Sequence, residues 1–579
     1  MKSATRPRDR EGDAEPAICG EVRRTHYARP LERTVDDIRR RVARALAAGE
    51  PRGQRERWRT QFLQAMRRGF IPGGRINAGA GSSRNTTLIN CFVQPIAAQR
   101  QGRDDSGRPG VDLALREIAR TLRAGGGVGV NLSDLPAATR DSDAAGLDPV
   151  SVILRMESRG RSLAAVGARR AAQMALIDIA HPDAEAVIDL KRHHDLHTVT
   201  LSICIPDTFM RALHGGAQRE RQAPFPHAEQ LWHRLIKAAF DTGNPGIVFI
   251  DHVNRTNNLS QIECLRACNP CAEQFLPDYG ACDLGSIDLT RIVRNPYTPL
   301  AQIDFGALDA IAQVAVRALD NVIDLTHWPL AQQAREARLT RRIGLGVTGL
   351  ADALIMLGLR YDRQPGRQTA MAIMRTIRHA AYSASVDLAI ERGPFPLCDA
   401  DRLIQPPHAA SRLPASLKRR IAAHGLRNSH LLAIAPAGTI SIAMAGNVSS
   451  GVEPVFAPRS VRTIRLPEGK RVQRIVDDLA LRLFRTLTPK PHTLPPAWCD
   501  VSTLRADDHL RMVAALQPLV DSGISKTLHL QPSASVQDLD RLLRTAWRSG
   551  LKGLTVFRPT VGAQTVLCDA RLASSQIRT

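Results

Sequence analysis

Apolar residues repeat with two different spacings along this chain. Apolar runs bounded by turn residues predict short strands at 198–205, 246–250, 341–347 and 430–435. Apolar positions three to four residues apart predict helices, for example over 30–70, 111–122 and 306–325. In the first of these the expected buried face contains Val35, Ile38, Val42, Ala45 and Leu46. Helices that alternate with short apolar strands predict an α/β fold whose strands are at least partly parallel.

Turn-forming residues divide the chain into regions. Pro72-Gly73-Gly74 separates the N-terminal helical pattern from the α/β part, and Gly125-Gly126-Gly127 ends the helix at 111–122. A polar, proline-containing stretch at 485–500 predicts a long loop. The expected regions are a charged, disordered tail at 1–17, a helical region at 18–70, the main α/β domain at 71–560 and a C-terminal tail at 561–579.

The charge of the chain is strongly positive. The formal net charge is +23, from 79 Lys and Arg against 56 Asp and Glu. Clustered basic residues would indicate a nucleic-acid binder. Here they are dispersed, as at Arg161, Arg169 and Arg170, and the sequence contains no recognised nucleic-acid module. We therefore expect the basic residues to lie on solvent-exposed helix faces, and we expect no nucleic-acid partner. The positive charge is also compatible with a small anionic substrate.

The cysteines and the N-terminus indicate a reducing compartment. Ten cysteines at irregular spacing in 579 residues do not resemble the dense disulfide framework of a small secreted domain. Residues 1–16 have no apolar signal core, and no run approaches the ~18 apolar residues that span a bilayer. The expected location is cytoplasmic, away from membranes, with most thiols reduced.

The segment 264–289 (CLRACNPCAEQFLPDYGACDLGSIDL) concentrates the candidate chemistry. Cys268 and Cys271 form a CxxC pair, but a zinc site would need a second ligand pair at matching spacing, so no metal is expected here. A buried strand whose cysteines act as small apolar residues is the plain alternative. Against it, Asn269 and Glu273 flank Cys271, and such a polar cluster is costly to bury without a function.

The order NPCAEQ (269–274), then GACDLGSIDL (280–289), resembles the catalytic segment of ribonucleotide reductases. The resemblance extends over residues 30–565, and several long motifs in family order make chance agreement implausible. The other matching segments are 70–95, 123–136, 169–188, 341–361, 427–457, 524–530 and 550–559. The resemblance implies a ten-stranded α/β barrel with a helical N-terminal region, and the reduction of ribonucleotides, expected to be diphosphates, to 2′-deoxyribonucleotides.

The resemblance also implies a role for five residues. Cys271 would carry a transient thiyl radical that removes the 3′ hydrogen of the ribose. Glu273 would act as general base on the 3′ hydroxyl, and Asn269 would hydrogen-bond the ribose. Cys91 and Cys282 would be the redox pair that ends each turnover as a disulfide. Because they are far apart in the sequence, only folding can bring them within bonding range.

Substrate binding is implied for a second set of residues. In the family pattern the turn Pro436-Ala437-Gly438-Thr439-Ile440-Ser441 grips the substrate phosphates, which suits N–H groups at a helix N-terminus together with hydroxyl donors. Asn90, Ala124 and Gly125 match positions that line the substrate cleft in relatives. From the residues alone, 436–441 would be an ordinary strand-to-helix turn, and Gly125–Gly129 would be a helix C-cap.

The radical source is narrowed by what the sequence lacks. A glycyl-radical reductase would need a C-terminal glycine motif and a Cys-rich zinc site, and a diiron-dependent one relays the radical through adjacent tyrosines. The sequence shows neither the glycine motif nor the Cys-rich zinc site, and no two of its five tyrosines are adjacent. The segment 550–559 resembles the adenosylcobalamin-dependent type, in which homolysis of the cobalt–carbon bond oxidises the cysteine directly. Adenosylcobalamin is therefore the expected cofactor.

Four departures from the family pattern qualify these expectations. Ala272 replaces a usual Gly, where a positive φ would be strained, and Ala437 replaces a usual Thr. The segment 137–150 is shorter and less Gly-rich than the usual effector loop. Cys568 stands alone where many relatives have a C-terminal cysteine pair, so the reductant is expected to be a thioredoxin-like protein or a separate cysteine tail. Relatives commonly form homodimers.

Two further interpretations stay open at this point. The chain could be the catalytic chain of a diiron-type reductase, or a degenerate paralogue that binds nucleotides without turnover. The altered loops favour the degenerate paralogue, whereas the presence of Asn269, Cys271, Glu273, Cys91 and Cys282 favours an active enzyme.

Overall fold

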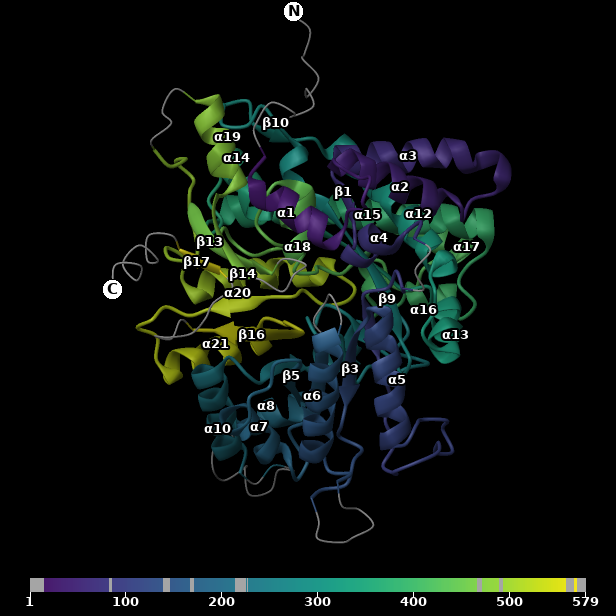
Figure 1. Cartoon of the computed structure of the whole chain (residues 1–579), viewed down its shortest axis with the longest axis vertical. Helices are drawn as coiled ribbons and strands as arrows, with labels where there is room; N and C mark the ends of the chain where they lie inside the picture. The colour runs from purple at the N-terminus through teal and green to yellow at the C-terminus, as the bar shows by residue number, and fades with distance from the viewer. Residues whose placement is uncertain are drawn as a thin grey trace, which may run out of the picture.

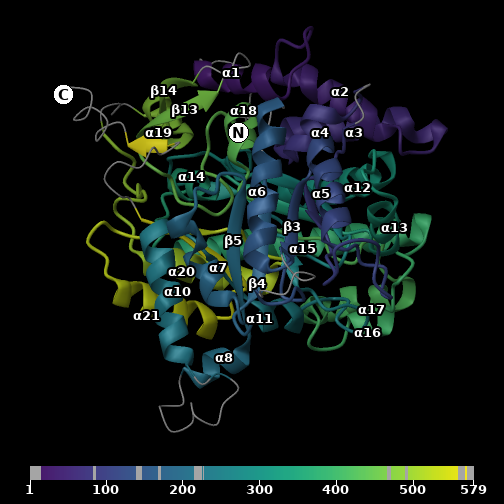
Figure 2. The same cartoon turned by 60° about the horizontal axis from the view of Figure 1, so that its bottom comes forward.

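A sheet with helices packed around it forms the body of the protein (Figures 1 and 2). The computed structural model describes residues 15–82, 86–138, 146–166, 171–213, 225, 227–465, 471–488, 493–558 and 567–569. Most of the expected tails at 1–17 and 561–579, and the centre of the segment 137–150, lie outside these residues. In the described part, no helix is long and apolar enough to cross a membrane.

The N-terminal region contains several helices in place of one long helical pattern. Thr34 and Asp37 form a capping box at the start of the second helix, which buries Ile38, Val42 and Leu46 as expected. Val35 and Ala45 are only partly buried. The pattern is interrupted after Ala47, and Pro51 precedes a short 3-10 turn, Arg52–Gln54. The helices are α1 (Ala17–His26), α2 (Val35–Ala47), α3 (Arg55–Arg68) and α4 (Gly74–Gly79).

The main sheet has ten strands, which confirms the predicted α/β fold. Its path runs β1-β9-β2-β3-β4-β5-β6-β16-β15, and β12 pairs with the free side of β9. The run from β2 to β6 is parallel throughout, whereas β9 is antiparallel to β1 and β2. The strands are β1 (Phe70–Pro72), β2 (Cys91–Val93), β3 (Gly127–Asn131), β4 (Gln173–Asp178), β5 (Val199–Ile205), β6 (Gly246–Phe249), β9 (Ala281–Asp288), β12 (Ile343–Thr348), β15 (Thr527–His529) and β16 (Gly553–Phe557).

The segment 430–434 lies between β12, at one edge of the sheet, and the residues that lead into β15 at the other edge. It was expected to be a strand, but it makes two isolated bridges, Leu345↔Leu432 and Ile434↔Ile524. Leu345 N–H donates to Leu431 O over 2.8 Å, and Ser525 N–H donates to Ile434 O over 2.9 Å. Since Leu345 belongs to β12 and Ile524 precedes β15, the segment joins the ends of the sheet as a barrel requires.

Helices cover the sheet on its outer side, and those that connect the parallel strands lie together at the bottom of Figure 1. They are α5 (Val111–Ala124), α6 (Pro149–Val166), α7 (Ala184–His193), α8 (Asp207–Ala212) and α10 (Ala228–Thr242). The remaining helices are α11 (Ile250–Arg255), α12 (Phe305–Leu325), α13 (Ala331–Thr340), α14 (Leu350–Met356), α15 (Gln364–Arg392), α16 (Ala400–Leu403), α17 (Ala415–His424), α18 (Gly438–Ala445), α19 (Leu479–Leu487), α20 (Ala506–Leu516) and α21 (Val536–Arg548).

Smaller sheets are separate from the main one. The expected loop at 485–500 begins inside α19, because Leu481 and Phe484 are buried and hold that helix to the body. Within the expected C-terminal tail, Leu567–Asp569 forms β17 and pairs with β13. The strands of the small sheets are β7 (Ala267–Cys268), β8 (Phe275–Leu276), β10 (Val293–Arg294), β11 (Gln302–Ile303), β13 (Arg459–Arg465), β14 (Arg471–Asp477) and β17 (Leu567–Asp569).

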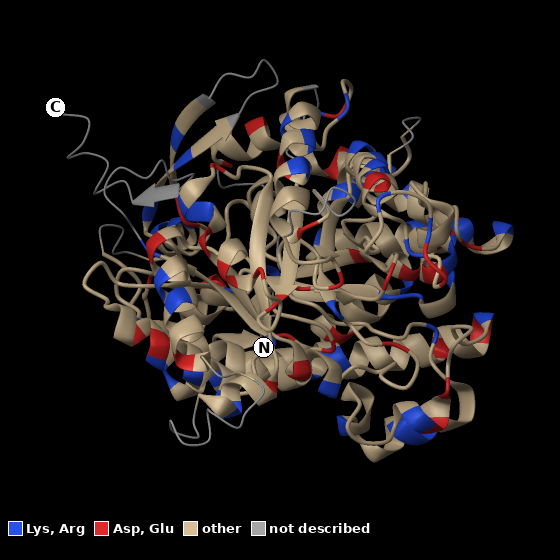
Figure 3. Cartoon of the chain, turned by 90° about the horizontal axis from the view of Figure 1, so that it is seen from below, with Lys and Arg blue, Asp and Glu red and all other residues tan. Residues whose placement is uncertain are grey.

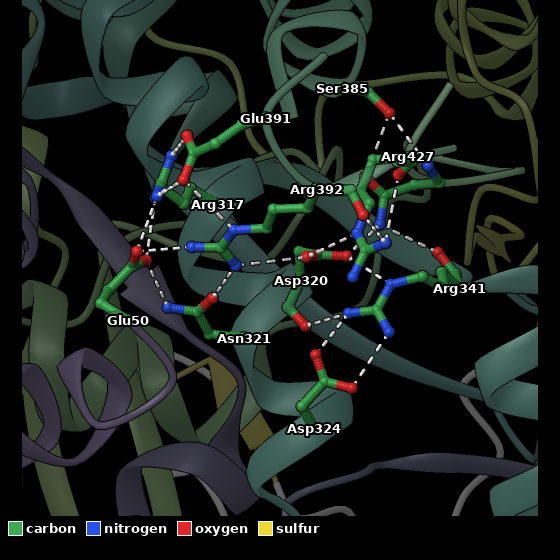
Figure 4. A network of polar contacts seen from close by, with 12 residues as sticks. Glu50, Arg317, Asp320, Asn321, Asp324, Arg341, Ser385, Glu391, Arg392 and Arg427 are labelled. Atoms are coloured by element: carbon green, nitrogen blue, oxygen red, sulfur yellow. Dashed lines mark hydrogen bonds and ion pairs between the residues drawn. The ribbon is translucent and has the colours of Figure 1, made fainter. Parts of the chain in front are cut away.

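Basic and acidic positions are intermixed along the ribbon, mainly on the outer helices and loops (Figure 3). An exception is a buried ionic network between α12, α15 and the N-terminal helices (Figure 4). Arg317 bonds both Glu50, over 2.6 Å, and Glu391, over 2.6 Å. Arg341 pairs with Asp320 over 2.8 Å, and the Asp320 side chain is completely buried. This network ties the N-terminal region to the barrel.

Candidate active site

The predicted radical cysteine lies at the tip of a hairpin. Strands β7 and β8 pair antiparallel with Cys268 opposite Phe275, and residues 269–274 form the tip. Asn269 N–H donates to Gln274 O over 3.0 Å, and its side-chain oxygen accepts from Gln274 N–H over 3.0 Å. These two bonds close the tip, so Cys271 is held at the end of a short and well-defined turn.

Glycines on three separate parts of the sheet make room for this hairpin. A Cβ atom at Gly129 on β3 would lie 1.7 Å from Cys268 O, and one at Gly344 on β12 would lie 2.5 Å from Gln274 Nε2. A Cβ at Gly523 would lie 2.6 Å from Ala272 O, and Gly523 N–H donates to Glu273 O over 2.8 Å. Strands β3 and β12 and residue 523 belong to widely separated parts of the main sheet. Because the hairpin contacts all three, it lies on the inner side of that sheet. The Gly125–Gly129 run is therefore more than the helix C-cap that its residues alone indicated.

Three of the predicted catalytic residues are in direct contact. Asn269 Nδ2 donates to Cys91 Sγ over 3.1 Å, and the Cys91 thiol donates to Glu273 Oε1 over 3.7 Å. Glu273 is 2% exposed, and burial raises the pKa of its carboxyl to about 7. Its second oxygen is buried without a hydrogen-bond partner. A carboxyl group of this kind can accept or release a proton near neutral pH.

Cys271 differs from the other thiols of the site in its accessibility. Its side chain is exposed, whereas Cys91 and Cys282 are buried. The protein around it nevertheless raises the pKa of the Cys271 thiol above its ordinary value, and the Glu273 carboxylate adds to the effect. The thiol therefore stays protonated at neutral pH and can be reached from solvent. The neighbouring Ala272 has φ +59°, the left-handed conformation in which its methyl group is strained.

Cys91 and Cys282 lie directly opposite each other. They are Cα partners in the antiparallel pairing of β2 with β9. Residues paired in this way have Cα atoms about 4.5–5.5 Å apart, within the range of about 4.4–6.8 Å found for disulfides. Burial raises the pKa of both thiols well above the ordinary value. The structure thus holds two reduced, protonated cysteines at a spacing that a disulfide can bridge.

The predicted phosphate turn lies next to Asn90. A Cβ at Gly73 would lie 3.0 Å from Asn90 Oδ1, and one at Gly74 would lie 3.7 Å from Ile440 Cγ2. The side-chain oxygen of Asn90 is buried without a hydrogen-bond partner. Residues 73–74 therefore lie between Asn90, the residue before Cys91, and the first turn of α18.

The N-terminus of α18 is open to a ligand. Gly438 and Thr439 are exposed, and no atom lies within 4 Å of a Cβ built at Gly438. Ala437 is the N-cap with φ +53°, and Ser441 Oγ donates to Gly438 O over 2.8 Å. Pro436 is half-buried and Ile440 is buried. The exposed N–H groups of this turn can bind an anion.

Ala124 and Gly125 end α5 close to the same region. Gly125 has φ +102°, and a Cβ there would lie 2.4 Å from the guanidinium of Arg75, the residue after Gly74. Thr87 N–H donates to Ala124 O over 3.0 Å. The sequence-predicted residues from five distant segments are therefore neighbours in the structure.

Two residues of this region were missed by the sequence reasoning. Tyr27, 2% exposed, shares a hydrogen bond with Thr439 in the phosphate turn. Asp283 follows Cys282, is completely buried, and has no hydrogen-bond partner for either carboxylate oxygen, so burial raises its pKa well above the ordinary value. No local pattern marks either residue, because both environments are made by segments distant in the sequence.

Two opposed cysteines and an accessible third cysteine near a buried carboxyl group are the groups that thiol–disulfide chemistry needs. The model of the ribonucleotide reductase barrel domain matches residues 89–226 and 218–557. The chain belongs to the ribonucleotide reductase family.

Curated relatives place the chain within this family more closely. It is 33% identical to the vitamin B12-dependent ribonucleoside-diphosphate reductase of Mycobacterium tuberculosis, over 92% of this chain and 76% of the relative. It is 28% identical to the enzyme of the same name from Thermoplasma acidophilum, over 84% of this chain and 63% of the relative. The ribonucleoside-diphosphate reductase large chain of Neurospora crassa is 27% identical, over 83% of this chain and 58% of the relative.

Proposed function

We propose that this protein is an adenosylcobalamin-dependent reductase that converts ribonucleoside diphosphates to 2′-deoxyribonucleotides for DNA synthesis. The observation that carries this function is the placement of Cys271 at the hairpin tip, between Asn269 and Glu273 and beside the opposed pair Cys91 and Cys282. The names of the most similar relatives support the cofactor and the substrate class.

Cys271 is the residue on which the radical reaction begins. When bound, adenosylcobalamin would supply the radical equivalent, and the Cys271 thiol would give up its hydrogen atom to it. Cys271 fits such an external source because its side chain is exposed while Cys91 and Cys282 are buried. The resulting thiyl radical removes the 3′ hydrogen of the ribose and returns it at the end of turnover.

Glu273 and Asn269 act on the ribose hydroxyls. With a pKa of about 7, the Glu273 carboxyl is partly ionised at neutral pH and can take the proton of the 3′ hydroxyl. Asn269 orients the sugar through its amide, whose oxygen and nitrogen already bond Gln274 N–H and Cys91 Sγ. Both groups lie in a buried setting, where a correctly placed hydrogen bond is strong.

Cys91 and Cys282 supply the two electrons. Replacement of the 2′ hydroxyl by hydrogen, with loss of water, consumes two hydrogen equivalents, and the pair supplies both as it becomes a disulfide. Ribonucleotide and dithiol therefore become deoxyribonucleotide, water and disulfide, and the radical is regenerated on Cys271. A thioredoxin-like protein or a separate cysteine tail then reduces the disulfide.

The turn 436–441 holds the substrate phosphates in this proposal. Gly438 and Thr439 are exposed, so their backbone N–H groups, with the Thr439 hydroxyl that also bonds Tyr27, would bind the phosphates. Asn90, Ala124 and Gly125 line the adjoining cleft. In this proposal residues 71–560 are the catalytic domain, residues 18–70 are the helical region that precedes it in the sequence, and the protein acts in the cytoplasm.

The direct test is turnover by the purified chain with adenosylcobalamin, a ribonucleoside diphosphate and dithiothreitol. We expect deoxyribonucleotide to form only when the cofactor is present, and Cys271→Ser to abolish it. Product made without cobalamin but with a diiron partner would reassign the radical source. Binding of nucleotide without product under either condition would identify a degenerate paralogue.

A further inference from the structure

Three metal-binding side chains meet at a place that the reductase reaction does not use. Glu453 comes from the segment after α18, His509 from α20 and His529 from the end of β15. One carboxylate oxygen and one nitrogen of each ring lie within 4.8 Å of one another. Separate elements thus bring together two imidazoles and one carboxylate.

His509 is buried, but its protein neighbours provide no hydrogen-bond partner for its ring nitrogens. Its side chain is 0% exposed, and neither ring nitrogen has a hydrogen-bond partner. The Nδ1 atom of His529 is also buried without a partner. An unpaired buried polar group is destabilising, so a ligand that satisfies these nitrogens would be stabilising.

The rest of the cluster is aromatic. The ring of His509 lies 5.8 Å from that of His529 and 6.4 Å from that of Tyr361, centroid to centroid. The His529 ring lies 5.5 Å from that of Phe557. These neighbours hold the imidazoles in place and offer them no hydrogen-bond acceptor at the ring nitrogens.

Lys526 is the cation that pairs with the Glu453 carboxylate of this cluster. Its ammonium group donates to Glu453 and, over 2.6 Å, to Thr527 O. The other oxygen of Glu453 accepts from Thr527 N–H over 2.9 Å. A metal ion would therefore compete with Lys526 for the Glu453 carboxylate, and its occupancy would depend on the concentration of free metal.

We propose that Glu453, His509 and His529 form a binding site for Zn²⁺ or a similar first-row divalent ion, with water as a fourth ligand. Two imidazoles and one carboxylate are a donor set that zinc commonly takes. Zinc bonds of about 2.0–2.2 Å place tetrahedral ligand atoms about 3.4 Å apart, so the side chains need to close in by roughly an ångström. The bound ion would link α20 to β15 and to the segment that follows α18.

Metal binding is measured on the full-length protein after removal of bound metal with a chelator. Co²⁺ is the best first probe, because its absorption spectrum separates nitrogen and oxygen ligands from thiolates, and the chain has ten cysteines. We expect one equivalent of Co²⁺ with no thiolate charge-transfer band, displaced by Zn²⁺. Absence of this equivalent, or a thiolate spectrum for it, would overturn the proposal.

Variants locate the site independently of reductase activity. His509→Gln and His529→Gln should each lose that equivalent, and His233→Gln, at an exposed histidine on α10, should keep it. Lys526→Met removes the competing ammonium group and should tighten Co²⁺ binding several-fold. Unchanged binding in both histidine variants, or weaker binding in Lys526→Met, would contradict the assignment. Because the readout is metal binding, failure here leaves the proposed reductase function untouched.

Discussion

A carboxyl group that works as a base near neutral pH needs an environment that raises its pKa, and Glu273 has one. Burial raises its pKa to about 7, and one of its oxygens has no partner. The other oxygen accepts from Cys91 over 3.7 Å. At the scale of single residues, the site depends on this carboxyl, on the accessible Cys271 and on the opposed Cys91 and Cys282.

The pH dependence of turnover follows from the direction of this shift. Glu273 is protonated below about pH 7 and ionised above it, so the base form, and with it kcat, should increase as the pH rises through about 7. Glu273→Gln should lower kcat by about 100-fold or more and remove this rise. The measurement is kcat against pH for both proteins. A variant that retains the same rise would show that another group titrates.

At the scale of elements, two packing contacts hold the catalytic parts in place. The hairpin β7–β8 fits against glycines of β3 and β12, and α1 packs on α18, where Arg23 Nε donates to Ala443 O over 3.2 Å. Each contact joins segments that are far apart in the sequence. A change at either one should therefore disturb catalysis without altering a catalytic side chain.

Gly129→Ala tests the close packing of the β7–β8 hairpin against β3. The new methyl group would lie 1.7 Å from Cys268 O, so the hairpin has to move away from β3. Overpacking of this kind costs about 1–3 kcal/mol of stability, and displacement of Cys271 should greatly reduce kcat. Urea unfolding and steady-state turnover measure the two effects. Gly53→Ala, where no atom lies within 4 Å of the added methyl group, is the control and should behave like the wild type.

Tyr27→Phe tests the support of the phosphate turn by α1. The variant loses the hydrogen bond to Thr439, a change worth about 0.5–1.5 kcal/mol, so KM for the nucleotide should rise by about 2- to 10-fold. The chemical step involves other residues, and kcat should change little. Tyr297→Phe removes a hydroxyl that donates to Ala480 O over 2.6 Å elsewhere and should leave KM unchanged. A fall in kcat with unchanged KM would contradict this role.

At the scale of the whole molecule, the buried network in Figure 4 connects the N-terminal helices to α12 and α15. Glu50 accepts from Arg317, Asn321 and Arg392. Its side chain is 0% exposed. Removal of one partner leaves buried charges without compensation, so the network couples the helical region to the stability of the barrel.

Glu50→Gln should destabilise the protein by about 3–5 kcal/mol, because Arg317 and Arg392 would lose their shared carboxylate. Guanidinium-induced unfolding measures the effect. Glu56→Gln, in an exposed pair with Arg59, is the control and should change the free energy of unfolding little. A similar small change for both variants would mean that the network contributes specificity instead of stability.

Most elements could be predicted because their patterns are local. The helix at 306–325 and the strands at 198–205 and 246–250 lie within one or two residues of α12, β5 and β6, since apolar periodicity reflects the face that a segment buries. The segment 430–435 was less predictable. Its apolar residues are buried as expected, but whether they form a regular strand or isolated bridges depends on partners elsewhere in the chain.

The sequence by itself determined the α/β class, the family and the identity of the candidate chemistry, because residue types and motif order are local properties. The tertiary structure alone decided that Cys91 faces Cys282, that Asn269 and Glu273 contact Cys91, and that the hairpin lies against Gly129. It also decided the partners of Tyr27 and the convergence of Glu453, His509 and His529. The physical reason is that strand register and burial are set by segments hundreds of residues apart, and these bring side chains together and shift their pKa values.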